Sequence, residues 1–133
     1  MSNAHKEVVK TYFKAMGAGD VELFKSTITE DYRAVIAGYS KISGTMDRDA
    51  VLAFVEGVPS MTRSGISFEI RCLTAEEDRV ASESLGRSVM VNGAEYNNQY
   101  IHLFRFHDGR IRQVTEYMDT QLAEKTLLPL MSH

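Results

Sequence analysis

The stretch Tyr96–Thr120, with the sequence YNNQYIHLFRFHDGRIRQVTEYMDT, decides the fold. Two apolar-rich runs flank His107-Asp108-Gly109, and a short connection that contains glycine predicts a β-hairpin. Because alternate residues of a strand share a face, one arm presents Asn98, Tyr100, His102 and Phe104 together, and the other presents Val114, Glu116 and Met118 together. One of these faces carries a His and the other a Glu. If helices cover these faces, the two ionisable groups are costly to bury, which indicates that they have a specific role.

The composition indicates one globular domain spanning residues 1–133, with 44% apolar and 25% charged residues. The net charge is −3 and no basic patch is present, so we expect no nucleic-acid partner. No apolar run approaches the roughly 20 residues of a membrane span, and no signal-peptide core opens the chain, so we expect a cytoplasmic protein without membrane contact. The lone Cys72 excludes an internal disulfide and a multi-cysteine metal site.

The chain begins with helical periodicity and ends with strands. Apolar spacing predicts helices over residues 5–16, 21–28 and 47–57, the last stopped by Pro59, and strands over 32–37, 66–74 and 80–91 before the hairpin. Gly38–Thr45 is expected to be a loop, and residues 120–128 are a candidate terminal helix ended by Pro129. The order α-α-β-α-β-β-β-β predicts an α+β fold in which a curved antiparallel or mixed sheet forms a cone around three N-terminal helices. The open end of such a cone suits a small-molecule pocket.

Three stretches carry a family resemblance: YFKAMGAGD at 12–20, FRFHDGRI at 104–111 and TEYMDT at 115–120. Together with the order of elements, they make nearly the whole chain resemble the superfamily of nuclear transport factor 2, ketosteroid isomerase and the SnoaL-like polyketide cyclases. The resemblance implies the cone fold. It is less specific for activity, because this superfamily holds enzymes, binding proteins and subunits without chemistry.

The resemblance to ketosteroid isomerases places Tyr12 at their oxyanion-hole tyrosine and His102 at their second oxyanion donor. Their catalytic base corresponds to Ile36, which cannot move a proton, so the chain departs from their usual mechanism. The resemblance to limonene epoxide hydrolases places Glu116 at an acid of the final strand. The chain departs from that site as well, because their Arg and second Asp correspond to Glu83 and Leu85.

The same resemblance implies which side chains line the cone. The strands would contribute Ala34, Ile36, Glu83, Leu85, Asn98, Tyr100, His102, Val114, Glu116 and Met118, and the helices Tyr12 and Phe54.

A carboxylate in an apolar pocket can act as a general base near neutral pH. We therefore assign Glu116 as the base, Tyr12 and His102 as oxyanion donors, and Glu83 as the group that orients His102. These parts suit proton transfer next to a carbonyl of a small hydrophobic molecule, which is isomerase, cyclase or dehydratase chemistry, with no cofactor and no metal.

Other interpretations stay open. Tyr12 and His102 can be structural, Glu116 can pair with Arg87 or Arg112, and Glu83 faces outward if its strand shifts by one residue. A metal site of Glu83, His102 and Glu116 is conceivable, although no HxxxH or HxH spacing supports it.

The protein can also be a non-catalytic module for an apolar ligand, or an interaction domain. The opposite face of the sheet carries several apolar side chains, and an exposed apolar patch of this kind indicates an interface. We therefore expect a homodimer in which this face is buried. The residues concerned are Ile101, Leu103, Thr115 and Tyr117.

Overall fold

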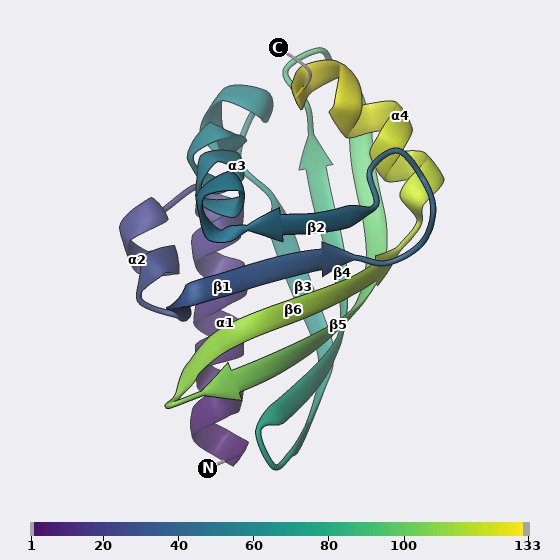
Figure 1. The fold of residues 1–133 in the computed structure, drawn as a ribbon. Helices are drawn as coiled ribbons and strands as arrows, with labels where there is room; N and C mark the ends of the chain where they lie inside the picture. The colour runs from purple at the N-terminus through teal and green to yellow at the C-terminus, as the bar shows by residue number, and fades with distance from the viewer. Residues whose placement is uncertain (1, 132–133) are drawn as a thin grey trace.

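The computed structural model describes residues 2–131, and its strands form a six-stranded mixed sheet in the order β2-β1-β6-β5-β4-β3 (Figure 1). The sheet is antiparallel except where β1 pairs with β6 in parallel. The strands are β1 (Ile28–Ile36), β2 (Gly44–Asp47), β3 (Ser67–Glu76), β4 (Arg79–Val89), β5 (Glu95–His107) and β6 (Arg110–Met118).

Four helices complete the α+β fold, and the sheet curves around the first and third of them (Figure 1). They are α1 (Ser2–Ala18), α2 (Val21–Lys25), α3 (Arg48–Met61) and α4 (Thr120–Met131). Asp20 and Asp47 cap α2 and α3, since their carboxylates accept hydrogen bonds from the backbone N–H groups of Leu23 and Ala50. The α4 helix packs against β5 at the end of the sheet where the chain terminates. No helix in residues 2–131 is long and apolar enough to cross a membrane.

The strand β2 is absent from the prediction, which treats Gly38–Thr45 as a loop. Residues 44–47 instead pair with residues 33–36 of β1 and form one edge of the sheet. Four residues at a sheet edge carry too little alternation to be recognised as a strand.

Both prolines lie inside helices, so the predicted stops at Pro59 and Pro129 are wrong. The ring of Pro59 fits because Gly19 faces it: a Cβ added there would meet Pro59 Cδ at 2.5 Å. Gly19 also has a φ of +71°, which residues with a side chain rarely adopt. A glycine at this position therefore allows both the turn that ends α1 and the close approach of α3.

The predicted β5–β6 hairpin is present, and its register sets the site. His102 pairs directly with Glu116, and Phe104 with Val114. The deep end of the cone is a closed core in which α1 packs on β3, β4 and β6, and α3 packs on β1 and β2. Its fully buried members include Val9, Tyr12, Phe13, Phe24, Val51, Val55, Phe104, Ile111 and Val114.

Candidate functional site

A cavity of about 290 Å³ lies between the concave face of the sheet and the helices. Its walls come from α1, α3 and α4, from the strands β1, β2, β3, β5 and β6, and from the loop between β1 and β2. They are mainly apolar and include Met16, Ala34, Ile36, Ile42, Met46, Val51, Phe54, Phe68, Met118, Ala123, Leu127, Leu128 and Met131. The polar lining side chains are Tyr12, Lys41, Tyr96, Tyr100, His102 and Glu116. This composition suits a small, largely apolar molecule held at a few polar points.

The pair His102–Glu116 crosses the cavity wall. His102 Nε2 lies 3.0 Å from Glu116 Oε1, and the exposed fractions of the two side chains are 4% and 19%. An ionised carboxylate only accepts hydrogen bonds, so Nε2 is the donor in this contact. Nδ1 is buried without a partner among the described residues. Glu116 Oε2 has no partner in residues 2–131 either, so this oxygen is free to accept a proton.

Tyr12 belongs to a buried pair of tyrosines. Its hydroxyl lies 2.6 Å from that of Tyr32, and either can be the donor by distance alone. Tyr12 lines the cavity and Tyr32 does not. If Tyr12 donated to Tyr32, the proton of Tyr32 would be buried without an acceptor among the described residues. The hydrogen bond therefore runs from Tyr32 to Tyr12, which leaves the Tyr12 proton for the cavity. Burial raises the pKa of both phenols, and the nearby Glu116 adds to both shifts, so both stay protonated.

A second tyrosine pair lies at the start of β5, toward α4. The hydroxyl of Tyr100 donates to that of Tyr96 across 3.0 Å, and Asn98 Nδ2 donates to the same Tyr96 oxygen across 3.1 Å. Burial raises the pKa of Tyr96 and of Tyr100, and Glu116 contributes to both. Tyr12, Tyr96 and Tyr100 line the cavity, and Tyr32 contacts Tyr12 from outside it. These four are here called the cavity tyrosines, and the charge of Glu116 adds to the upward pKa shift of each.

Most of the predicted site residues lie in the wall of the cavity or directly beside it. Tyr12, Ile36, Phe54, Tyr100, His102, Glu116 and Met118 line the cavity together, as does Ala34. Val114 faces the same side but is fully buried in the core beneath the cavity. Asn98 is buried beside the cavity, where it connects Tyr96 to the backbone of Asp119.

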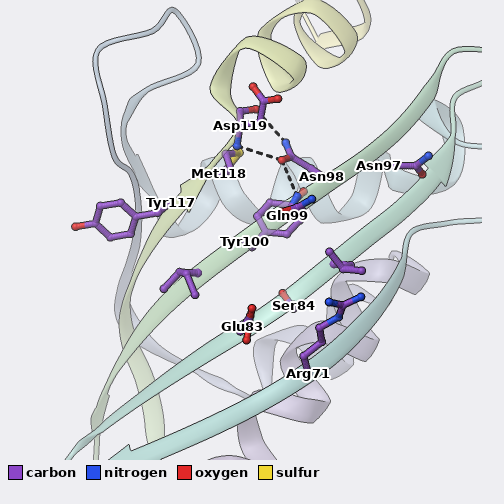
Figure 2. A pocket seen from close by; sticks show the side chains of 12 residues that line it. Arg71, Glu83, Ser84, Asn97, Asn98, Gln99, Tyr100, Tyr117, Met118 and Asp119 are labelled. Atoms are coloured by element: carbon purple, nitrogen blue, oxygen red, sulfur yellow. Dashed lines mark hydrogen bonds between the residues drawn. The ribbon is translucent and has the colours of Figure 1, made fainter.

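Glu83 and Leu85 are the exceptions, because the structure places both on the outer face of the sheet. Figure 2 shows the outer groove, in which Glu83 lies near Arg71, with Tyr117 farther along the groove. The strand β4 turns its small residues inward, and Ser82 pairs with His102. The reason is space: a Cβ on Gly86 would meet Tyr100 Cε2 at 3.0 Å and Phe68 Cε1 at 3.2 Å. Large side chains such as Leu85 therefore point outward. Glu83 lies on the opposite face of the sheet from His102 and cannot orient it.

Two alternatives for Glu116 are excluded by the ion pairs that the arginines make elsewhere. Arg87 pairs with Glu69 at 3.0 Å, and Arg112 pairs with Asp31 at 3.0 Å. In residues 2–131, no group of three or more His, Cys, Asp or Glu side chains could hold a metal ion.

The sequence interpretation missed the roof of the cavity and two of its tyrosines. The α4 helix supplies several lining residues, and the backbone N–H of Lys41 donates to Glu124 of α4 across 3.0 Å, which ties the β1–β2 loop to this helix. Tyr96 shares the alternation of Asn98, Tyr100 and His102, so the strand pattern could have found it. Tyr32 gave a weaker signal, because a bulge lies between Ile28 and Arg33.

Comparison with known proteins gives a consistent answer on the fold. The family model described as SnoaL-like domain matches residues 9–114. An NTF2-like protein from Burkholderia pseudomallei K96243 has a TM-score of 0.77 at 21% identity, covering 96% of this chain and 98% of its own. The protein Bal32a, from a soil-derived mobile gene cassette, has a TM-score of 0.81 at 19% identity, with 94% and 97% covered.

An LEH-like epoxide hydrolase from M. tuberculosis has a TM-score of 0.75 at 18% identity, with 98% of this chain and 94% of that chain covered. At these identities the likeness shows the fold alone. A comparison with curated proteins found no significant match.

Proposed function

Since this chain belongs to the SnoaL-like domain family, we propose that it is a cofactor-free enzyme that moves a proton next to the carbonyl group of a small hydrophobic molecule. The observation that carries the proposal is the contact between His102 and Glu116 on the wall of an apolar cavity. Two ionisable groups are costly to bury for structure alone, and replacing them with apolar residues would serve the core at least as well. Their retention at this point favours chemistry.

The proposed base is Glu116. Its free oxygen takes a proton from the carbon next to the carbonyl, and the electron pair of the broken C–H bond forms an enolate, whose oxygen becomes negative. The same carboxyl group returns the proton to this carbon or to a conjugated one, so the net reaction is an isomerisation and needs no other reactant. General base catalysis of this kind contributes about 10²–10⁴-fold to the rate.

The roles of His102 and Tyr12 follow from their hydrogen bonds. The Nε2–H group of His102 is occupied by Glu116, so we propose that His102 is a positioning residue that holds the carboxylate, and not an oxyanion donor. Tyr12 receives its hydrogen bond from Tyr32 and has a proton for the cavity. It is the proposed donor to the enolate oxygen, where a preorganised donor is worth most in a water-poor site.

The test is exchange of α-hydrogens for deuterium in D₂O, followed by NMR on a panel of small cyclic and aromatic ketones. The variant Glu116→Gln should lose at least about a hundredfold in exchange rate. The matched control is Glu83→Gln, which removes the same charge from the outer face and should leave the rate unchanged. Exchange by Glu116→Gln at the wild-type rate would show that Glu116 is not the base.

Non-catalytic binding of an apolar ligand is the second candidate. It is favoured by the cavity walls, in which Glu116, His102 and the exposed Lys41 at the rim are the only acidic or basic side chains among the lining residues besides the tyrosines. A ketone that binds in the cavity without any exchange above the buffer rate would support this candidate against the enzyme. Hydration of an epoxide, the activity in the name of the M. tuberculosis relative, would use the same carboxylate to activate water.

A further inference from the structure

We propose that Tyr96 is a second ligand-binding residue, whose hydroxyl proton is held ready for a neutral oxygen acceptor at the α4 end of the cavity. This inference rests on the proposed function only in taking the cavity as the ligand site. It concerns binding, and it does not depend on which residue moves the proton.

The first step is the orientation of Asn98. Its Oδ1 accepts backbone N–H groups from Gln99 at 2.8 Å and from Asp119 at 3.1 Å (Figure 2). Both donors are main-chain groups that cannot turn into acceptors, so the side-chain amide cannot be flipped. Its Nδ2 must therefore point the other way, where it donates to the carbonyl of Asp119 and to the hydroxyl of Tyr96, each at 3.1 Å.

The second step concerns the hydroxyl oxygen of Tyr96, which accepts two hydrogen bonds. It receives the hydrogen bond of Asn98 and that of Tyr100. A phenolic hydroxyl has one proton and two acceptor positions, so both acceptor positions are used and the proton is left over. No acceptor for this proton lies within hydrogen-bond distance among residues 2–131, although Tyr96 is only 2% exposed. A buried donor without an acceptor is costly, and Tyr96 lines the cavity, so the missing acceptor belongs to the ligand.

The third step concerns the kind of acceptor. Glu116 lies close enough to raise the pKa of Tyr96, after the larger effect of burial. A second carboxylate next to Tyr96 would be repelled by Glu116 in this poorly solvated space. A neutral carbonyl or hydroxyl oxygen meets no such cost. The cavity, with the liquid volume of about ten water molecules, accommodates a ligand with one ring.

The position of Tyr96 also fixes the direction of the ligand. Along β5 the inward residues run from Tyr96 through Tyr100 and His102 to Phe104, and Tyr12 packs on Phe104 with ring centroids 5.2 Å apart. The His102–Glu116 pair thus lies between two hydroxyl donors. A molecule with two oxygen functions separated by an apolar segment would satisfy both donors and place that segment against Glu116.

The experiment compares two probes of nearly the same shape, acetophenone and ethylbenzene, whose dissociation constants are measured by NMR titration. In the variant Tyr96→Phe, acetophenone should bind about tenfold more weakly, which corresponds to roughly 1.4 kcal/mol, while the affinity for ethylbenzene should not change. The control is Tyr39→Phe, which makes the same chemical change at a fully exposed position outside the cavity and should leave the affinity for acetophenone unchanged.

Three results would overturn the inference. Acetophenone binding could be unaffected by Tyr96→Phe, it could be weakened equally by Tyr39→Phe, or ethylbenzene could bind the wild-type protein where acetophenone does not. Failure of both probes to bind the wild-type protein would reject the cavity itself, and with it the proposed function. Unchanged exchange in Glu116→Gln would reject the proposed base alone and leave the role of Tyr96 intact.

If Tyr96→Phe fails to fold, the carbonyl stretch of acetophenone bound to Tyr12→Phe gives the answer, because this variant lacks the other hydroxyl donor of the cavity. Donation from Tyr96 lowers the stretching frequency relative to an alkane solution. A frequency equal to that in alkane would overturn the inference.

Discussion

Removing the two hydroxyls of the Tyr12–Tyr32 pair one at a time should destabilise the protein unequally. Tyr12→Phe leaves the Tyr32 hydroxyl buried in the core without an acceptor, which costs about 1–3 kcal/mol. Tyr32→Phe leaves the Tyr12 hydroxyl at the cavity, where water can replace the lost partner, so the cost is that of one net hydrogen bond, about 0.5–1.5 kcal/mol. In the double variant neither hydroxyl is left unpaired, and the total cost should not exceed that of Tyr12→Phe.

The assay is urea unfolding followed by circular dichroism for the wild type, the two single variants and the double variant. The expected coupling free energy is roughly 1–2 kcal/mol, well above the few tenths found for independent sites. Tyr39→Phe should leave the midpoint unchanged, because the side chain is fully exposed. Additive costs, or a larger cost for Tyr32→Phe than for Tyr12→Phe, would refute the direction assigned to this hydrogen bond.

Two further predictions concern alkaline pH and self-association. Burial raises the pKa of all four cavity tyrosines above the unfolded value near 10, so their contribution to stability is complete below that pH and is lost as the pH rises. The free energy of unfolding should therefore fall above about pH 10 by up to roughly 1.4 kcal/mol per pH unit for each such tyrosine, and a constant value between about pH 9 and 11 in urea titrations would contradict this. Ile101 and Tyr117 are 48% and 55% exposed on the outer sheet face, so we propose a homodimer through this face; light scattering at micromolar concentration should give twice the monomer mass for the wild type and a smaller mass for Ile101→Glu, and a monomeric wild type would reject the proposal.

The hairpin shows what local sequence can determine. Its connection contains Asp108 and Gly109, both with positive φ, which matches the sequence signal for a tight turn. The turn alone would place His102 opposite Thr115, and a bulge between Arg105 and Phe106 moves the pairing by one residue, so that His102 faces Glu116. The turn was therefore accessible from the sequence, but the pairing of His102 with Glu116 was not.

The strand β4 shows where the family resemblance misleads. The resemblance placed Glu83 and Leu85 in the cone, whereas the inward residues are small, as at Ser84 and Gly86. The rings of Tyr100 and Phe68 occupy the space above Gly86 and come from the neighbouring strands. The charged residues Arg79, Glu83 and Arg87 share the outward face, so the alternation of the strand itself favoured the observed parity.

The roof of the cavity was unpredictable from the sequence. The α4 helix has apolar residues at helical spacing, but nothing in its own sequence says which surface they cover. Its place follows from contacts with β5 and from the hydrogen bond between Lys41 and Glu124, which lie 83 residues apart. The partners of Tyr12 and Tyr96 were hidden in the same way, since hydrogen bonds between side chains depend on the assembled fold.

The parallel pairing of β1 with β6 has a consequence for the order in which the protein folds. Ile36 pairs with Glu116, 80 residues later in the chain, whereas β3 to β6 are joined as successive hairpins. Closing so long a loop costs conformational entropy before the stabilising contacts between β1 and β6 form, and this cost slows folding. During synthesis, β1 and the short strand β2 leave the ribosome long before β6 exists. One backbone edge of β1 thus stays unpaired until β6 has been made, and an unpaired strand edge is a site for aggregation during that interval.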